Sequence, residues 1–295
     1  MADVSTTLLQ VTKITNEGKA ITTDTLAIEE PLEIRIEYGP AANRQLKNIS
    51  VTMRTPGHDV ELAIGFLFTE GVIKSAVDIS ENGYYFKPCS NNKQNILLIK
   101  LREDVSLNLQ NTDRNFYTTS SCGVCGKASI EAIRTISPGA IANDDLEITS
   151  EFLHRLPEIL RDNQDVFELT GGLHASALFN TSGQLLIARE DVGRHNALDK
   201  LIGAALNLNM LPLNSYVLML SGRMSFELIQ KAAMAGIKIV GAIGAPSSLA
   251  VELAQEFDIT LVGFLREERF NVYSGEQRVK DNYKPFTKNR EAIKR

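Results

Sequence analysis

Two of the three cysteines in this chain lie two residues apart, in a segment of small and polar residues. Cys122 and Cys125 directly follow the run Thr118–Ser121. Residues 128–134 carry helix-forming and apolar side chains at helical spacing, so a helix is predicted immediately after the pair. The positive end of that helix, together with Lys127, favours the thiolate form of a cysteine. Because a thiolate attacks sulfur, the segment predicts sulfur chemistry.

Three other roles for the cysteine pair are weaker. A structural zinc site needs four ligands, and the remaining thiol, Cys89, has neither a second Cys-x-x-Cys nor a histidine pair beside it. No metal site is therefore predicted. A thioredoxin-like dithiol follows a buried strand, whereas Arg114–Tyr117 is at most a short strand. A disulfide staple is unusual in a chain expected in the cytoplasm. Reactive thiols are favoured, with redox exchange and sulfur carriage both open.

Composition places the chain among ordinary globular proteins. It has 295 residues, enough for two domains, with 43% hydrophobic and 23% charged residues. The N-terminal residues lack the features of a signal peptide, and no apolar run approaches the ~18 residues of a membrane span. We therefore expect a cytoplasmic protein without a membrane partner. The net charge of −5 argues against nucleic acid as a partner.

The first part of the chain predicts β-structure. Apolar and polar side chains alternate up to about residue 55, as in Leu32–Tyr38, which is typical of antiparallel strands. A helix is predicted over 58–68, and another strand over 95–101. We assign residues 1–115 to a β-rich α+β domain. The cysteine loop with its helix follows at 116–140.

The second half predicts a parallel sheet. Strands and helices alternate along the chain at 216–220, 226–235, 237–243, 249–257 and 259–264. This order is typical of two right-handed βαβ crossovers. Ligands of such sheets bind beyond the carboxyl ends of the strands. We assign residues 141–277 to an α/β cofactor-binding domain, and 278–295 to a basic tail that is solvated or disordered.

Two segments at this predicted rim suit a nucleotide. Ser221, Gly222 and Arg223 offer a hydroxyl, an open backbone and a guanidinium, which together suit a phosphate. Residues 263–269 bring an aromatic ring, two arginines and two carboxylates, which can stack on a base and accept from a guanine edge. A third segment, Pro246–Ser248, is explained equally well by a serine that caps the next helix. We therefore predict a nucleotide-like ligand.

Polar residues also gather further upstream. His174 lies in one polar segment, and His195 begins a helix that continues to Leu206. Either histidine suits a catalytic base or a ligand, although a hydrogen-bonded structural role is the favoured interpretation for each. Asp199 and Lys200 are expected to lie with His195 on a solvated helix face. The entrance of this helix would also suit an anion.

Several separate motifs resemble those of one family. They occur in this order: Arg54–His58, Cys122–Lys127, Thr170–His174, Asp191–Ala197, Ser221–Arg223 and Gly263–Arg269. In this order, and over residues 30 to 275, the chain resembles the FdhD/NarQ family of formate dehydrogenase accessory sulfurtransferases.

The resemblance implies a function that spacing alone does not. Members accept sulfur from a cysteine desulfurase as a persulfide and pass it to the bis(molybdopterin guanine dinucleotide) form of the molybdenum cofactor, which formate dehydrogenase needs. By position, Cys122 would carry the persulfide and Cys125 would assist. The stretch that contacts the guanine dinucleotide would be Phe264, Leu265, Arg266, Glu267, Glu268 and Arg269.

The resemblance also implies a fold. The second domain would be a cytidine-deaminase-like three-layer α/β/α domain with parallel βαβ units, and the protein would be a homodimer. The deaminase signature is absent, so deamination is not implied. Two alternatives stay open: a dithiol–disulfide oxidoreductase and a non-catalytic molybdenum cofactor chaperone. A reductase would not need the nucleotide-binding rim, and a chaperone would still function without Cys122.

Overall fold

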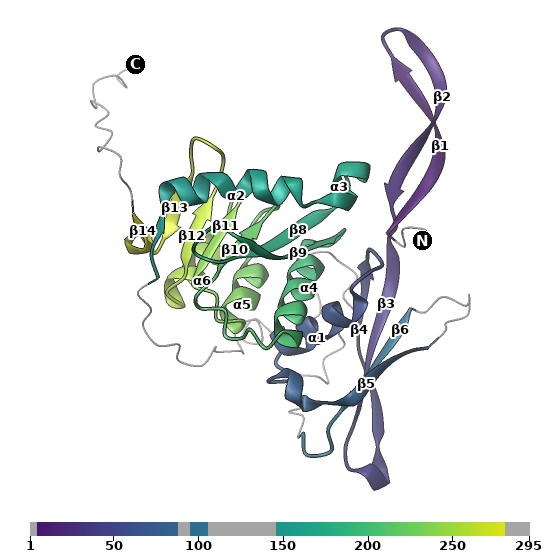
Figure 1. Ribbon diagram of the computed structural model, residues 1–295. Coiled ribbons are helices and arrows are strands. Elements are labelled where there is room, and N and C mark those ends of the chain that lie inside the picture. The colour runs from purple at the N-terminus through teal and green to yellow at the C-terminus, as the bar shows by residue number, and fades with distance from the viewer. Residues whose placement is uncertain (1–4, 88–94, 106–145, 281–295) are drawn as a thin grey trace.

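Two sheets and the helices between them organise the fold (Figure 1). The computed structural model describes residues 5–87, 95–105 and 146–280. Cys89, Cys122 and Cys125, together with the helix predicted after them, lie outside these residues.

The first sheet has four strands in the order β4-β3-β6-β5. Their bounds are β3 (Glu30–Tyr38), β4 (Gln45–Arg54), β5 (Ile79–Lys87) and β6 (Ile96–Leu101). The predicted alternation is confirmed, because Leu32, Ile34 and Ile36 are all fully buried on one face. Helix α1 (Asp59–Thr69) follows β4 and packs on this apolar face, close to its predicted bounds.

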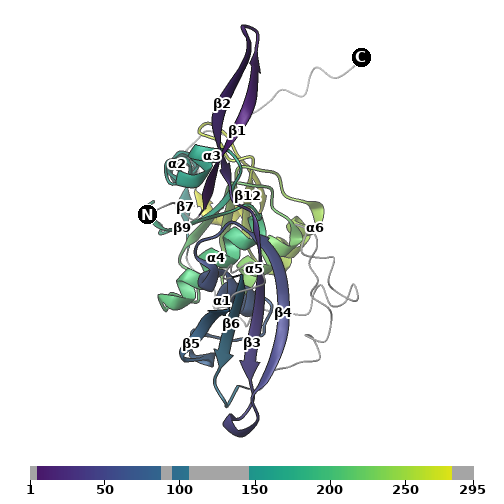
Figure 2. The ribbon, with the colours of Figure 1, turned by 90° about the vertical axis from the view of Figure 1, so that its right-hand side faces the viewer.

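A long ribbon precedes this sheet. Strands β1 (Thr6–Thr15) and β2 (Gly18–Ala27) pair with each other over their whole length and project away from the body of the molecule (Figure 2). Most of their side chains are exposed, including Ile14 and Ile21.

The second sheet has six strands in the order β13-β12-β11-β10-β8-β9. Their bounds are β8 (His174–Phe179), β9 (Leu185–Asp191), β10 (Val217–Leu220), β11 (Ile239–Ala242), β12 (Thr260–Gly263) and β13 (Asn271–Ser274). The predicted parallel unit is confirmed, because β10, β11 and β12 pair in parallel and alternate with helices α5 (Phe226–Met234) and α6 (Ser248–Glu256). The other three strands are antiparallel to their neighbours.

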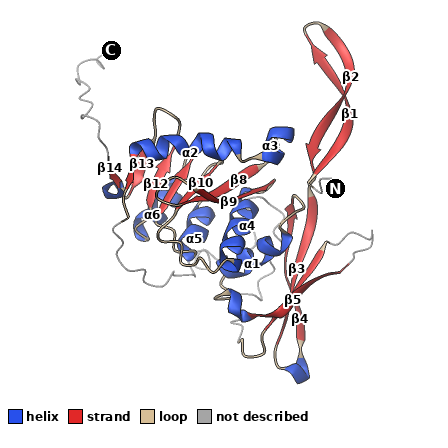
Figure 3. Cartoon of the chain, in the orientation of Figure 1, coloured by secondary structure: helices blue, strands red, loops and turns tan. Residues whose placement is uncertain are grey.

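Helices cover both faces of the six-stranded sheet (Figure 3). Helix α2 (Ser150–Asp162), followed by α3 (Asp165–Thr170), lies on one side, where Leu153 and Leu156 join a core with Val217 and Met219. Helices α4 (Arg194–Asn207), α5 and α6 lie on the other side. The three-layer arrangement is thus present, whereas likeness to cytidine deaminases remains a prediction.

The last described residues belong to the fold. Strand β14 (Val279–Lys280) pairs with β7 (Ile148–Thr149), and the buried side chain of Arg278 binds the Asp258 carboxylate. The predicted tail boundary at 278 is therefore too early by these three residues. Across the described part of the chain, no helix is long and apolar enough to span a membrane.

The described residues up to 105, with the four-stranded sheet, form the first half of the molecule, and residues 146–280, with the six-stranded sheet, form the second. Helices α1 and α4 join these two halves in one apolar core. They cross at two glycines: a Cβ on Gly65 would lie 1.9 Å from the Asp199 carbonyl oxygen, and one on Gly203 would lie 1.9 Å from that of Glu61. Only hydrogen at these positions allows the two backbones to approach so closely. Leucines from both helices, among them Leu62, Leu67 and Leu201, belong to the same buried cluster.

Candidate functional site

The carboxyl ends of β9 to β12 meet at one edge of the six-stranded sheet, which we call the rim. Because β8 and β13 run antiparallel to their neighbours, their first residues, His174 and Asn271, lie at the same edge. The Gly244 amide donates to the Gly222 carbonyl at 3.2 Å, and the Phe264 amide donates to the Gly244 carbonyl at 3.1 Å. These bonds place the two segments predicted to bind a nucleotide on the same rim, on either side of Gly244, with β11 between the strands that they follow.

The loop after β12 exposes the aromatic side chain of Phe264 and buries that of Leu265. Phe264 has a left-handed backbone (φ 52°) and is 44% exposed. Such a conformation is uncommon outside glycine and is found at functional sites. Leu265 is fully buried in the core under α2, so its side chain does not face the rim.

The polar residues of this loop divide into two groups. The Arg266 guanidinium donates to the carbonyls of Ile243 (2.9 Å) and Leu265 (2.8 Å), so it holds the loop shape. The remaining predicted contact residues, Glu267, Glu268 and Arg269, are exposed.

The loop after β10 places the Gly222 backbone and the charged side chain of Arg223 at the rim. The Ser221 hydroxyl oxygen accepts from the Ala175 amide at 2.8 Å, which extends the pairing of β8 with β10. Gly222 is packed closely, because a Cβ there would lie 3.2 Å from His174 Nδ1. Arg223 is exposed beside it. Burial, aided by the charges of Arg194 and Arg223, lowers the pKa of His174, so its imidazole is neutral at pH 7.

The entrance of α4 is anchored by a buried carboxylate. The Oδ1 atom of Asp191 accepts from the Gly193 amide (2.8 Å) and from the Asn196 side chain (3.0 Å). Its Oδ2 atom accepts from the Thr55 amide (3.2 Å) and pairs with Lys200 Nζ at 2.7 Å. Asp191 is fully buried. Its contacts with Gly193 and Asn196 fix the turn that begins α4, and its contact with Thr55 joins this turn to the segment after β4.

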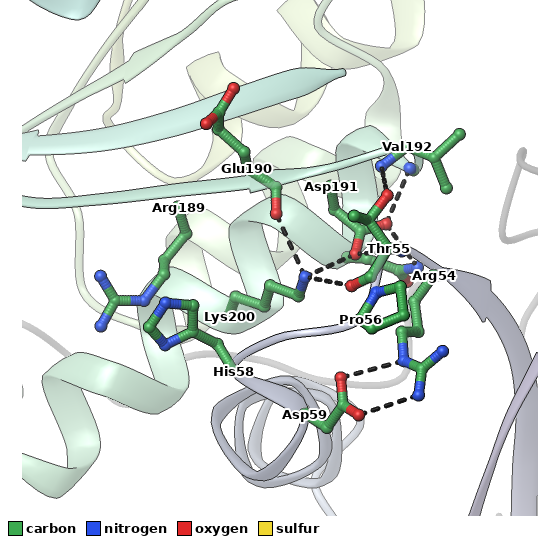
Figure 4. A network of polar contacts seen from close by, with 12 residues as sticks. Arg54, Thr55, Pro56, His58, Asp59, Arg189, Glu190, Asp191, Val192 and Lys200 are labelled. Atoms are coloured by element: carbon green, nitrogen blue, oxygen red, sulfur yellow. Dashed lines mark hydrogen bonds and ion pairs between the residues drawn. The ribbon is translucent and has the colours of Figure 1, made fainter. Parts of the chain in front are cut away.

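Lys200 completes this anchor and connects it to the first half (Figure 4). Besides Asp191, its ammonium donates to the carbonyls of Thr55 (2.9 Å) and Glu190 (3.1 Å), so all three N–H donors are used. On the other side, Arg54 forms two hydrogen bonds of 2.9 Å with Asp59 at the start of α1. The segment between β4 and α1 is thus clamped against the rim-forming half.

A second buried network lies deeper along α4. Asp199 and Lys231 are both buried, and Lys231 Nζ lies 3.0 Å from each Asp199 oxygen. The Thr69 hydroxyl donates to Asp199 at 2.9 Å. Burial raises the pKa of Asp199 to about 6, although Lys231 counteracts it. Burial alone would lower the pKa of Lys231, but the carboxylates of Asp199, Glu70 and Glu227 raise it instead.

The expectation of a solvated face on α4 is therefore wrong. Asp199 and Lys200 are only 2% and 1% exposed, because α4 lies between the sheet, α1 and α5, and each charge has a buried partner from another element. His195 is buried as well, and its Nε2 lies 3.1 Å from the Ser225 hydroxyl, so it has the hydrogen bond that the favoured structural role requires. The partners Thr55 and Lys231 were missed, because long-range pairing leaves no local pattern.

Among the residues that the structure describes, no group of three or more potential ligands is placed to hold a metal ion. The chemistry that this part of the site offers is instead that of an anion-binding surface. It combines arginines, a neutral imidazole, a close-packed glycine backbone and an exposed aromatic ring.

The chain is similar in sequence and in fold to known proteins. A "Sulfur carrier protein FdhD" of Mycolicibacterium paratuberculosis is 50% identical over 274 residues, which cover 92% of this chain and 97% of that protein. A protein of the same name from Sulfurisphaera tokodaii is 41% identical, with coverage of 92% and 98%. The crystal structure of a Desulfotalea psychrophila protein, described as a formate dehydrogenase accessory protein, superposes with a TM-score of 0.68 at 24% identity and covers 94% of this chain and 100% of that one.

That superposition bears on the fold, whereas the sequence matches decide the family. The model of the FdhD/NarQ family matches residues 27–280, a range that includes both sheets and the two cysteines Cys122 and Cys125. With half of all aligned residues identical to one relative and most of the chain matched, this chain belongs to the FdhD/NarQ family.

Proposed function

We propose that this protein is a sulfur carrier that serves formate dehydrogenase. Cys122 accepts sulfur from a cysteine desulfurase, and the rim holds the bis(molybdopterin guanine dinucleotide) cofactor that receives it. The observation that carries the proposal is the family membership of a chain that contains a Cys-x-x-Cys pair, since relatives that match over nearly their whole length are named sulfur carriers.

The loading step needs one reactive thiolate. The Cys122 thiolate attacks the terminal sulfur of the desulfurase persulfide, a new S–S bond forms on Cys122, and the desulfurase cysteine leaves as a thiolate. No electrons enter or leave the pair. Lys127 and the predicted helix after the cysteine pair favour this thiolate.

Delivery needs two electrons, because persulfide sulfur must become sulfide. Cys125 is a source of these electrons: its thiolate attacks the Cys122 sulfur, the S–S bond to the terminal sulfur breaks, and sulfide leaves for the cofactor. The product is a Cys122–Cys125 disulfide, which an external thiol must reduce before the next cycle. Such a thiol can also replace Cys125 in part, so Cys125→Ala should keep partial activity.

The rim supports the cofactor part of the proposal. A large polyanion with guanine bases requires cationic side chains and a stacking surface, and Arg223, Arg269 and Phe264 lie on two loops of the same rim. Arg223→Ala and Arg269→Ala should each weaken GDP binding about ten-fold, since a charge-assisted contact contributes roughly 1.5–3 kcal/mol. Wild-type affinity in both variants, measured by calorimetry, would place the nucleotide elsewhere. The cytoplasmic location and homodimer belong to the same proposal.

Mass spectrometry after incubation with a desulfurase and cysteine tests the central step. Wild-type protein and the Cys89→Ala control should gain one sulfur, about 32 Da on a reactive thiolate, whereas Cys122→Ala should gain none. In cells that lack the native protein, Cys122→Ala should yield formate dehydrogenase without activity. Full formate oxidation with Cys122→Ala would instead favour the chaperone, and a reductase would act on disulfides without needing GDP.

A further inference from the structure

Two arginines at the rim have no carboxylate partner in the part of the chain that the structure describes. Arg194 begins α4, and Arg223 follows β10. Neither guanidinium forms an ion pair or a hydrogen bond with any other described residue. The Nε atom of Arg194 is buried and lacks a hydrogen-bond acceptor within the same part of the chain. Buried N–H donors are nearly always satisfied in native proteins, so this one calls for an explanation.

The position of Arg194 is also unfavourable for the helix. It is the first residue of α4, where the macrodipole is positive, and the first turn of the helix contains no acidic residue. A cation at this end destabilises a helix, whereas an anion stabilises it. Neither helix formation nor ion pairing therefore accounts for an arginine here.

The side chains of His174 and Arg194 lie beside Gly222, and Arg223 follows it in the chain. A Cβ at this position would lie 3.2 Å from His174 Nδ1 and 3.9 Å from Arg194 Cδ, so both side chains border its backbone. The His174 pKa responds to Arg194, Arg223 and Asp191, which places these charges near the imidazole. Asp191 is the nearby carboxylate, but its oxygens already bind Lys200 and three N–H donors. The positive charges of Arg194 and Arg223 beside Gly222 are thus not neutralised by any carboxylate among residues 5–87, 95–105 and 146–280.

We infer that Arg194, Arg223 and His174 form a binding site for a phosphate group, in which the buried Nε–H of Arg194 donates to a phosphate oxygen. The inference deepens the proposed function, on which it rests: the phosphate belongs to the nucleotide part of the ligand at the rim. Phe264 lies two strands along the same rim from Gly222, a separation of about 10 Å. This site would hold the phosphate end of a nucleotide whose base lies near Phe264.

Calorimetry with GDP, guanosine and inorganic pyrophosphate tests the site. Arg194→Gln should weaken GDP and pyrophosphate binding ten-fold or more, because a charge-assisted contact to phosphate is lost, and should leave guanosine binding unchanged. Arg194→Lys keeps the charge but lacks Nε, so it should recover only part of the affinity. The matched control is Arg102→Gln, which removes an exposed arginine paired with Asp104 on the first half.

Two further measurements separate binding from a structural role. Ligand-free Arg194→Gln should melt at the same temperature as the wild type or higher, since it removes a cation from the helix start. If Arg194 had a structural role, replacing it with glutamine would lower the melting temperature. By NMR, the pKa of His174 should rise when pyrophosphate neutralises the two arginines, and this rise should be smaller in Arg194→Gln. Arg223→Gln, at an exposed position, repeats the test without perturbing α4.

The outcomes distinguish this inference from the proposed function. If GDP binds equally well to the wild type, Arg194→Gln and Arg223→Gln, the phosphate site is wrong, and sulfur loading on Cys122 still decides the carrier role. If pyrophosphate binding depends on Arg194 but GDP binds no better than pyrophosphate, the phosphate site stands and guanine recognition is wrong. If the wild type binds neither probe, the phosphate site is wrong.

Discussion

Asp191 brings together the turn before α4, the segment after β4 and the ammonium of Lys200. A carboxylate and an ammonium that are both buried are costly to separate, because the remaining charge has no water to solvate it. The pair therefore matters less for its own attraction than for the penalty of breaking it. Because the pair anchors the turn from which Arg194 begins α4, breaking the pair would also shift this part of the rim.

We predict that Lys200→Met lowers the free energy of unfolding by about 3–5 kcal/mol, because it leaves Asp191 charged and buried. Asp191→Asn should also destabilise, since Lys200 then lacks its anion. The double variant should be more stable than the sum of the single effects predicts. Urea denaturation of the four proteins measures this, and strictly additive losses would contradict the coupling.

At the scale of elements, the crossing of α1 and α4 depends on two glycines. In an exposed helix, alanine is about 1 kcal/mol more favourable than glycine. At Gly203 the added methyl would overlap the Glu61 carbonyl, so the helices must separate. We predict that Gly203→Ala lowers the melting temperature, with a loss of about 1–3 kcal/mol. Gly172→Ala is the control, because its methyl would meet no atom closer than 3.8 Å; equal effects at both glycines would rule out the crossing as the cause.

Elements with a strong local pattern could be predicted from the sequence. The alternation in β3 and the strand–helix alternation from β10 to β12 follow from side-chain periodicity alone. Helix α2 was missed although Leu153, Leu156 and Leu160 mark its buried face, and Pro157 in its interior is unfavourable for a helix. Strands β8 and β9 were also missed, although they form a local antiparallel hairpin with each other. The pairing of β8 with β10, which joins this hairpin to the sheet, links segments far apart in the sequence and leaves no local pattern.

The candidate site, too, has a part that could be predicted from the sequence and a part that could not. Arg223 and Phe264 could be placed near each other because parallel strands end at one edge. The buried pairs Asp191–Lys200 and Asp199–Lys231 could not, since their partners lie on different elements and a charged helix face is usually solvated.

At the scale of the whole molecule, an ion pair across the two halves should make stability depend on pH. Glu61 of α1 binds Arg189 of β9, with Nη2 and Oε1 2.8 Å apart. Burial alone would raise the pKa of Glu61, but Arg189 and His58 lower it to about 2, from a usual value of 4.5. A lowered pKa contributes stability that is complete above the unfolded-state value and is lost as pH falls through the folded-state value.

We therefore predict that the wild type loses up to about 3 kcal/mol of stability from this group between pH 4.5 and pH 2. Glu61→Gln should be less stable than the wild type at pH 7, and the difference should shrink toward pH 2. Chemical denaturation across this range measures both proteins. Glu252→Gln, at an exposed position on α6, is the control; a difference between wild type and Glu61→Gln that stays constant with pH would contradict the prediction.

The packing of α1 against α4 has a consequence for synthesis on the ribosome. The apolar face of α1 is complete once residue 69 has emerged, but α4 begins only at residue 194. At roughly 5–20 residues per second, on the order of ten seconds pass before its partner helix is translated. During that time the nascent chain exposes a surface destined for the core, and we expect this surface to be open to non-native contacts until α4 has been made. The first half acquires its native burial only after translation is well advanced.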